Sequence, residues 1–78
     1  MATVKVLLFG KLADYAGNES IMIDGVENSS LLIENLEFKF PKFKNNIYSI
    51  AINNKLVFDS LKLENGDVVA LMPPFSGG

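Results

Sequence analysis

An alternation of side chains near the start of the chain predicts a β-strand over residues 3–9. One set of alternating positions is wholly aliphatic and is assigned to the core: Val4, Val6 and Leu8. The opposite face of this strand would then turn Leu7 and Phe9 toward solvent. Exposed apolar residues of this size on one face are typical of a surface that docks on a partner.

The next segments predict a short helical turn and a second strand. Leu12, Ala13 and Tyr15 suit a single turn that Gly17 and Asn18 close. Residues 19–23 then read as a strand with Ile21 and Ile23 on one side and Met22 on the other. Together, the two strands are expected to pair antiparallel.

A helix is expected from about Ser30 to about Lys39. Asn28, Ser29 and Ser30 are all suitable N-cap residues, and Ser30 is preferred. An apolar stripe at helical spacing is expected to pack against the sheet: Leu32, Ile33, Leu36 and Phe40. Pro41 should end the helix because it cannot continue the hydrogen-bond ladder. The polar residues beyond it are interpreted as a solvated loop: Lys42, Lys44, Asn45 and Asn46.

The second half of the chain predicts three further strands, over residues 48–52, 55–57 and 68–72. The positions expected to point inward are Ile50, Ile52, Val69 and Leu71, and those expected to point outward are Ala51, Val68, Ala70 and Met72. Asn53-Asn54 suits a tight turn, because asparagine tolerates positive φ, and residues 65–67 suit another. Residues 60–64 are expected to be irregular or to form one helical turn.

This order of elements predicts an α+β domain in which one main helix packs on one face of a mixed sheet of about five strands. A single helix leaves the other face uncovered. If the first and last strands are neighbours, that face gathers Leu7, Phe9, Ala70 and Met72. We interpret it as a partner surface; the ordinary alternative is scattered surface residues.

The end of the sequence carries the candidate chemistry. The last six residues are Pro73, Pro74, Phe75, Ser76, Gly77 and Gly78. The two prolines have fixed φ and no N–H, so they should stop the last strand and extend the chain outward. The final glycines have no Cβ, so the Gly78 carboxylate can enter a slot too narrow for a side chain. The alternative is an ordinary disordered chain end.

Composition narrows the function further. The 78 residues suit one small domain, and the absence of cysteine and histidine removes the usual nucleophiles, bases and zinc ligands. We therefore expect no metal site and no permanently bound cofactor. A net charge of −2 with no arginine argues against a nucleic-acid-binding surface. No apolar run is long enough to span a bilayer and no signal peptide is evident, so a cytoplasmic protein is expected.

Several motifs resemble the small subunit of molybdopterin synthase, a sulfur carrier of the MoaD/ThiS family with the ubiquitin-like β-grasp fold. The motifs are Asn53-Asn54-Lys55, the run from Gly66 to Leu71, the segment from Val4 to Gly10 with Leu12 and Gly17, and above all residues 73–78. Phe75 stands where the family more often has a small β-branched residue. Ala13 stands where some relatives have arginine, which removes one possible ion pair with the partner.

This resemblance implies a cycle in which other proteins supply the catalytic groups. An ATP-dependent adenylyltransferase similar to ubiquitin-activating enzymes would adenylate Gly78, and a sulfur donor protein would convert it to a thiocarboxylate. Gly77 would help the chain end to thread into a pocket of the large subunit, where sulfur passes to a cyclic pyranopterin precursor and forms the molybdopterin dithiolene. The chain would be no enzyme on its own. Its expected partner contacts are Leu7, Phe9, Met72, Pro73, Pro74, Phe75 and Ser76.

Three other functions remain open at this point. The chain resembles, less closely, sulfur carriers for the thiazole of thiamine, which share the terminal chemistry. It is also compatible with a ubiquitin-like modifier that is conjugated to lysines through Gly78. A third possibility is a plain interaction module, for which the apolar face matters and the final glycines do not.

Overall fold

The computed structural model describes residues 2–45 and 48–72, which form five strands, two α-helices and one 3-10 helix. In chain order the elements are β1 (Ala2–Leu8), α1 (Lys11–Ala16), β2 (Ser20–Val26), α2 (Ser29–Lys39), η1 (Pro41–Asn45), β3 (Ser49–Ile52), β4 (Lys55–Val57) and β5 (Val68–Met72). The last strand has the predicted bounds. The first two strands are displaced or longer, because β1 starts at Ala2 and β2 continues to Val26.

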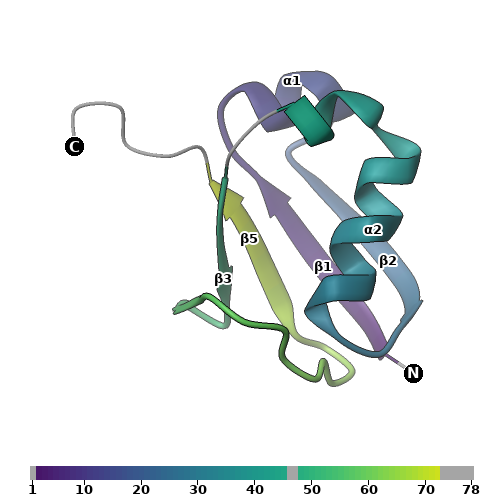
Figure 1. Cartoon of the computed structure of the whole chain (residues 1–78), viewed down its shortest axis with the longest axis vertical. Helices are drawn as coiled ribbons and strands as arrows, with labels where there is room; N and C mark the ends of the chain where they lie inside the picture. Colours follow the sequence, from purple (N-terminus) through teal and green to yellow (C-terminus); the bar gives the residue numbers. More distant parts are fainter. Residues whose placement is uncertain (1, 46–47, 73–78) are drawn as a thin grey trace.

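The strands form one mixed sheet in the order β2-β1-β5-β3-β4. β1 pairs antiparallel with β2 and parallel with β5, and β3 pairs antiparallel with both β5 and β4. The first and last strands are therefore neighbours at the centre of the sheet (Figure 1). This confirms the condition on which the predicted open face depended.

One face of the sheet is covered by α2, and the hydrophobic core lies between the two layers (Figure 1). Fully or nearly fully buried side chains from both layers meet there: Val4, Val6, Leu8, Leu32, Leu36, Val69 and Leu71. All of them had been assigned to the core from periodicity. The predicted α+β architecture, a mixed sheet with one main helix on one face, is confirmed.

The start of α2 corrects the predicted cap. The N-cap residue is Asn28, whose side-chain oxygen accepts a hydrogen bond from the Leu31 backbone N–H at 2.9 Å. Ser30, the predicted cap, lies inside the helix, and its backbone N–H donates to the Ser60 hydroxyl oxygen at 3.4 Å. Asn28 also forms an isolated antiparallel β-bridge with Lys62, a contact between segments that are distant in the sequence. At the other end, α2 stops at Lys39, before Pro41, as predicted.

The predicted loop after α2 is wrong for the residues that the structure describes. Residues Pro41–Asn45 form the 3-10 helix η1, and Asn46 lies outside the described residues. Phe43 in this helix is completely buried and stacks on Phe40 with ring centroids 5.4 Å apart. Two lysines flank Phe43 in the sequence, so the segment reads as polar. The aromatic ring nevertheless points inward, because its burial removes a large apolar surface from water.

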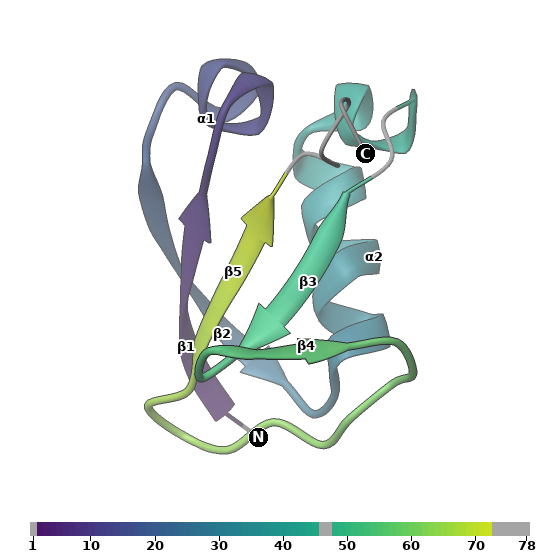
Figure 2. The same ribbon diagram turned by 90° about the vertical axis from the view of Figure 1, so that its left-hand side faces the viewer.

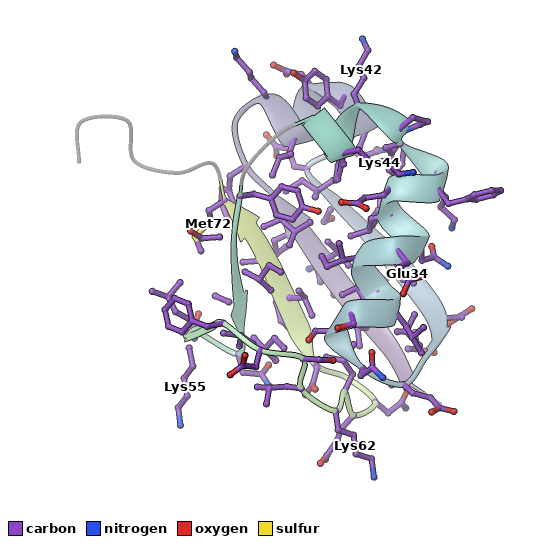
Figure 3. The ribbon with its side chains drawn as sticks, viewed as in Figure 1. Glu34, Lys42, Lys44, Lys55, Lys62 and Met72 are labelled. Carbon is purple, nitrogen blue, oxygen red and sulfur yellow. The ribbon has the colours of Figure 1, made fainter. Side chains whose placement is uncertain are left out.

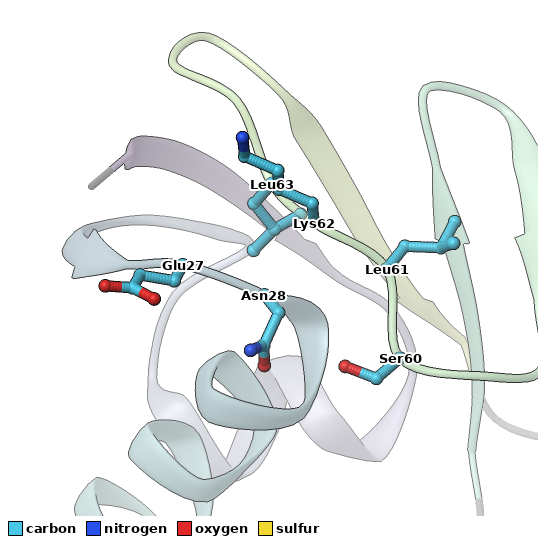
Figure 4. Close-up of a pocket in the computed structure, with 6 residues that line it drawn as sticks. All are labelled: Glu27, Asn28, Ser60, Leu61, Lys62 and Leu63. Carbon is cyan, nitrogen blue, oxygen red and sulfur yellow. The ribbon is translucent and has the colours of Figure 1, made fainter.

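Tight turns and a long irregular segment close the end of the sheet where β1 and β5 begin. Asn53 and Asn54 both have positive φ, 50° and 73°, which confirms the predicted turn between β3 and β4. The segment between β4 and β5 is irregular over residues 60–64, one of the two predicted alternatives. Leu63 is buried there. Figure 4 shows this segment beside the start of α2, where the Leu61 N–H donates to the Ser29 hydroxyl oxygen at 2.9 Å.

Tyr48 joins α2 to the start of β3 and gives the fold an alkaline pH dependence. Its hydroxyl donates to the Glu37 carboxylate at 3.2 Å. Burial, followed by the charge of Glu37 and this hydrogen bond, raises the pKa of Tyr48 from 10.0 to about 12. A pKa raised in the folded state means that the contribution to stability is complete below about pH 10 and is lost as the pH rises through about 12.

We therefore expect the unfolding free energy of the unchanged protein to fall more steeply between pH 10 and 12 than that of Tyr48→Phe. Urea unfolding at a series of pH values measures both slopes. Lysines titrate in the same range in both proteins, so only the difference between the slopes reports on Tyr48. Equal slopes would contradict the assignment.

Candidate functional site

The pairing of β1 with β5 defines the candidate site. The two strands are parallel, so both end at the same edge of the sheet, and the Phe9 N–H donates to the Leu71 carbonyl oxygen at 3.2 Å. Residues 73–78 follow Met72 directly in the sequence and therefore begin at this edge. The central ladder of the sheet thus places Met72, the residue before this segment, beside Phe9.

The face of the sheet opposite α2 is open (Figure 2). The register places one row of cross-strand neighbours on this face: Leu7, Ala70, Ala51 and Leu56. Leu7 and Ala70 are half-buried, whereas the Leu56 side chain is 59% exposed. Ala51 points to this face as predicted, although its small side chain is buried between its neighbours. We refer to this surface, together with Phe9 and Met72, as the open face.

The structure brings together the predicted partner residues that it describes. Phe9 lies just beyond β1 and its side chain is 46% exposed. Met72 ends β5 and points away from α2 (Figure 3). Leu7 precedes both on the same side of the sheet. The remaining predicted site residues lie outside the described residues: Pro73, Pro74, Phe75, Ser76, Gly77 and Gly78.

Two further exposed apolar residues, Leu56 and Met22, lie outside the partner surface predicted from the sequence. Leu56 reaches the open face because the tight Asn53-Asn54 turn pairs it with Ala51. Met22 had been placed on the side away from the core, and it lies opposite Lys5 with its side chain exposed. The hairpin register was the signal that would have extended the predicted surface to Leu56.

The charged groups at this site do not form a metal centre. Within residues 2–45 and 48–72, no group of three or more histidine, cysteine, aspartate or glutamate side chains is arranged to hold a metal ion. Lys5 lies on β1 between Thr3 and Leu7.

Among the helices of residues 2–45 and 48–72, none has the length and apolarity required to cross a bilayer. The geometry is suited to apolar docking beside the start of the last six residues.

A five-stranded mixed sheet that packs one main helix on one face, with parallel first and last strands, defines the class of ubiquitin-like β-grasp domains. The chain belongs to the ThiS family, whose model matches residues 6–78. It is 31% identical over 81 residues to the molybdopterin synthase sulfur carrier subunit of Dictyostelium discoideum, covering 95% of this chain and 94% of that protein.

Two solved structures extend the comparison. Small archaeal modifier protein 1 from Methanosarcina acetivorans is similar with a TM-score of 0.85 and 28% identity, covering 100% of this chain and 98% of that one. A chain in the complex of subunits 1 and 2 of the molybdopterin-converting factor from Helicobacter pylori has a TM-score of 0.70 and 28% identity, with 97% and 99% coverage. The recognised family and the predicted fold are therefore confirmed.

Proposed function

We propose that this protein is the sulfur-carrier small subunit of a molybdopterin synthase, with the Gly78 carboxylate as its reactive group. The observation that carries the proposal is the parallel pairing of β1 and β5, which starts residues 73–78 beside the exposed Phe9 and the open face. Family membership and the similarity to a named molybdopterin synthase sulfur carrier support it.

The proposed chemistry begins with activation of an unreactive group. A carboxylate is ionised at neutral pH and is a poor electrophile. Attack of a Gly78 oxygen on the α-phosphorus of ATP, within a ubiquitin-activating-like adenylyltransferase, forms the acyl-adenylate and releases pyrophosphate. Hydrosulfide delivered by a donor protein then attacks the acyl carbon, AMP leaves, and loss of the proton gives a thiocarboxylate. The anionic sulfur is a nucleophile that requires no cysteine in this chain.

The second half of the proposed cycle takes place on the large subunit. The open face would dock there through Leu7, Phe9 and Met72, while residues 73–76 line the path and Gly77 lets the chain end pass through a narrow slot. The sulfur of the thiocarboxylate would attack a carbon of the cyclic pyranopterin precursor. Water would then cleave the acyl–sulfur bond, which leaves the sulfur on the pterin and regenerates the Gly78 carboxylate for another cycle. Subunits 1 and 2 of the Helicobacter pylori converting factor form a protein–protein complex, which supports a large-subunit partner. In this proposal the chain donates sulfur and the large subunit catalyses.

Intact-mass analysis tests the proposal directly. After incubation with ATP, the cognate adenylyltransferase and sulfide, the mass should rise by the difference between one sulfur and one oxygen, and omission of ATP should prevent the change. Transfer from the loaded protein to a pterin precursor should then restore the original mass. An unchanged mass in the complete reaction would refute the carrier function, and transfer to a thiazole precursor alone would reassign it to thiamine synthesis.

A second candidate function is protein modification through Gly78. The similarity to small archaeal modifier protein 1, at 28% identity over nearly the whole of both chains, favours this alternative. The same activated Gly78 acyl group would be attacked by a lysine amine instead of sulfur, so an isopeptide bond would form. Denaturing electrophoresis, followed by chymotryptic digestion and mass spectrometry of the Ser76-Gly77-Gly78 remnant on lysines, distinguishes the two functions.

A further inference from the structure

A groove lies on the helix side of the sheet, away from the open face. It has a volume of about 320 Å³ and runs between the first turns of α2 and the strands β3 and β4. It is lined by Ser29, Ser30, Ile33, Glu34, Ile50, Val57, Phe58, Asp59 and Ser60. Ile33, Ile50 and Val57 are half-buried and pack against the core, so they form an apolar floor.

Phe58 adds a large, exposed aromatic residue to the lining of this groove. It follows β4, lines the groove and leaves 89% of its side chain exposed. An exposed phenylalanine next to a concave apolar floor provides a large contact area at small cost in conformational entropy. Phe38 on α2 is equally exposed, at 87%, but does not line the groove, so exposure alone does not define the feature.

The charges around the groove select the chemistry of its occupant. Glu34 on α2 and Asp59 after β4 contribute an exposed carboxylate to each wall, and the lining contains no lysine. Lys55 and Lys62, on neighbouring segments, extend outward at the periphery of the molecule (Figure 3). The negative potential between two carboxylates therefore favours a cation next to the apolar floor.

Two serine hydroxyls of the lining accept hydrogen bonds from backbone N–H groups of the fold. The Ser60 hydroxyl oxygen accepts from the Ser30 N–H, and the Ser29 hydroxyl oxygen accepts from the Leu61 N–H. These bonds tie the start of α2 to the segment after β4, so both walls are held by the fold. A preorganised groove of this kind binds with little reorganisation.

We propose that this groove binds a segment of a partner protein in which an apolar side chain is flanked by lysine or arginine. The apolar side chain would lie on Ile33 and Val57 and against the Phe58 ring, and the cation would lie between Glu34 and Asp59. The open face is on the other side of the sheet, so both surfaces can be occupied at once. The proposal goes beyond sulfur transfer and does not depend on it.

Nuclear magnetic resonance titration of the full chain tests the proposal with a synthetic peptide in which leucine alternates with lysine. Saturable shifts are expected at the amides of Ile33, Ile50, Val57 and Phe58. Phe58→Ala and Glu34→Lys should each weaken binding by about tenfold. The matched control Phe38→Ala should retain the original affinity, and peptides with glutamate for lysine or serine for leucine should bind much more weakly.

Three outcomes would overturn the proposal. They are equal affinity of the Phe58→Ala and Phe38→Ala proteins, shifts confined to the open face, and groove shifts that depend on protein concentration without peptide, which would indicate a second copy. Dispersed amide spectra confirm that each variant is folded. Thiocarboxylate loading of Phe58→Ala should remain normal, so failure of the groove proposal and failure of the proposed carrier function give different results.

Discussion

Deletion of Gly78 is expected to abolish thiocarboxylate formation while leaving the fold unchanged. The reacting carboxylate would move back by one residue, roughly 3.3 Å for an extended chain, which places it out of reach of the nucleotide in the adenylyltransferase. The hydrophobic core of the described residues lies between α2 and the sheet and is built from side chains that this deletion leaves in place, so we expect the shortened protein to keep its fold. ATP–pyrophosphate exchange and intact mass measure the loss.

The control for this deletion is the binding of the shortened protein to the large subunit. The open face remains complete, so affinity should fall only by the contribution of one glycine. Thermal unfolding should match that of the unchanged protein. Sulfur transfer that survives the deletion would show that Gly78 is not the reacting residue, and would favour a plain interaction module.

Replacement of Met72 by aspartate is expected to weaken association with the large subunit by at least about 2 kcal/mol, or roughly thirtyfold in Kd. Met72 is a half-buried residue of the open face at the edge where residues 73–78 begin. In the complex, the aspartate carboxylate at this position would be buried without a partner, which costs binding free energy. Phe9→Ala should act in the same direction because it removes an exposed aromatic contact at the same edge.

Isothermal titration with the purified large subunit measures these affinities. Leu31→Asp is the matched control, because Leu31 is also an exposed apolar residue but lies on α2, in the first turn, where a carboxylate favours the helix. It should bind normally. Equal affinities of Met72→Asp and the unchanged protein would remove the open face from the proposed interface.

The sequence was sufficient to predict the elements that bury one face. Val4, Val6 and Leu8 alternate with more exposed positions, and a shift of one residue would turn all of them to solvent. The same constraint applied to β5, whose bounds were predicted without error. Leu7 and Met72 were placed on the open face by the same reasoning.

Other features depended on contacts between distant segments. Asn28, Ser29 and Ser30 are all suitable caps by residue type, and Asn28, which caps α2, also forms a bridge with the distant Lys62. Phe43 is buried by aromatic rings from α1 and the start of β3, which no local pattern around two lysines indicates. Leu56 joined the open face only through the register of the hairpin. The roles of residues 73–78 came from composition and resemblance, and they remain predictions.

The parallel orientation of β1 and β5 also determines where a probe can be attached. Ala2 starts β1 at one end of the sheet, and Met72 finishes β5 at the other. The seven residues of β1 span roughly 23 Å at about 3.3 Å each. A fluorophore or immobilisation handle joined ahead of Ala2 would therefore stand about one sheet length from Met72, which directly precedes residues 73–78 in the sequence. Single-molecule recordings of the proposed charging and discharge could then be made with the probe at the far end of the sheet.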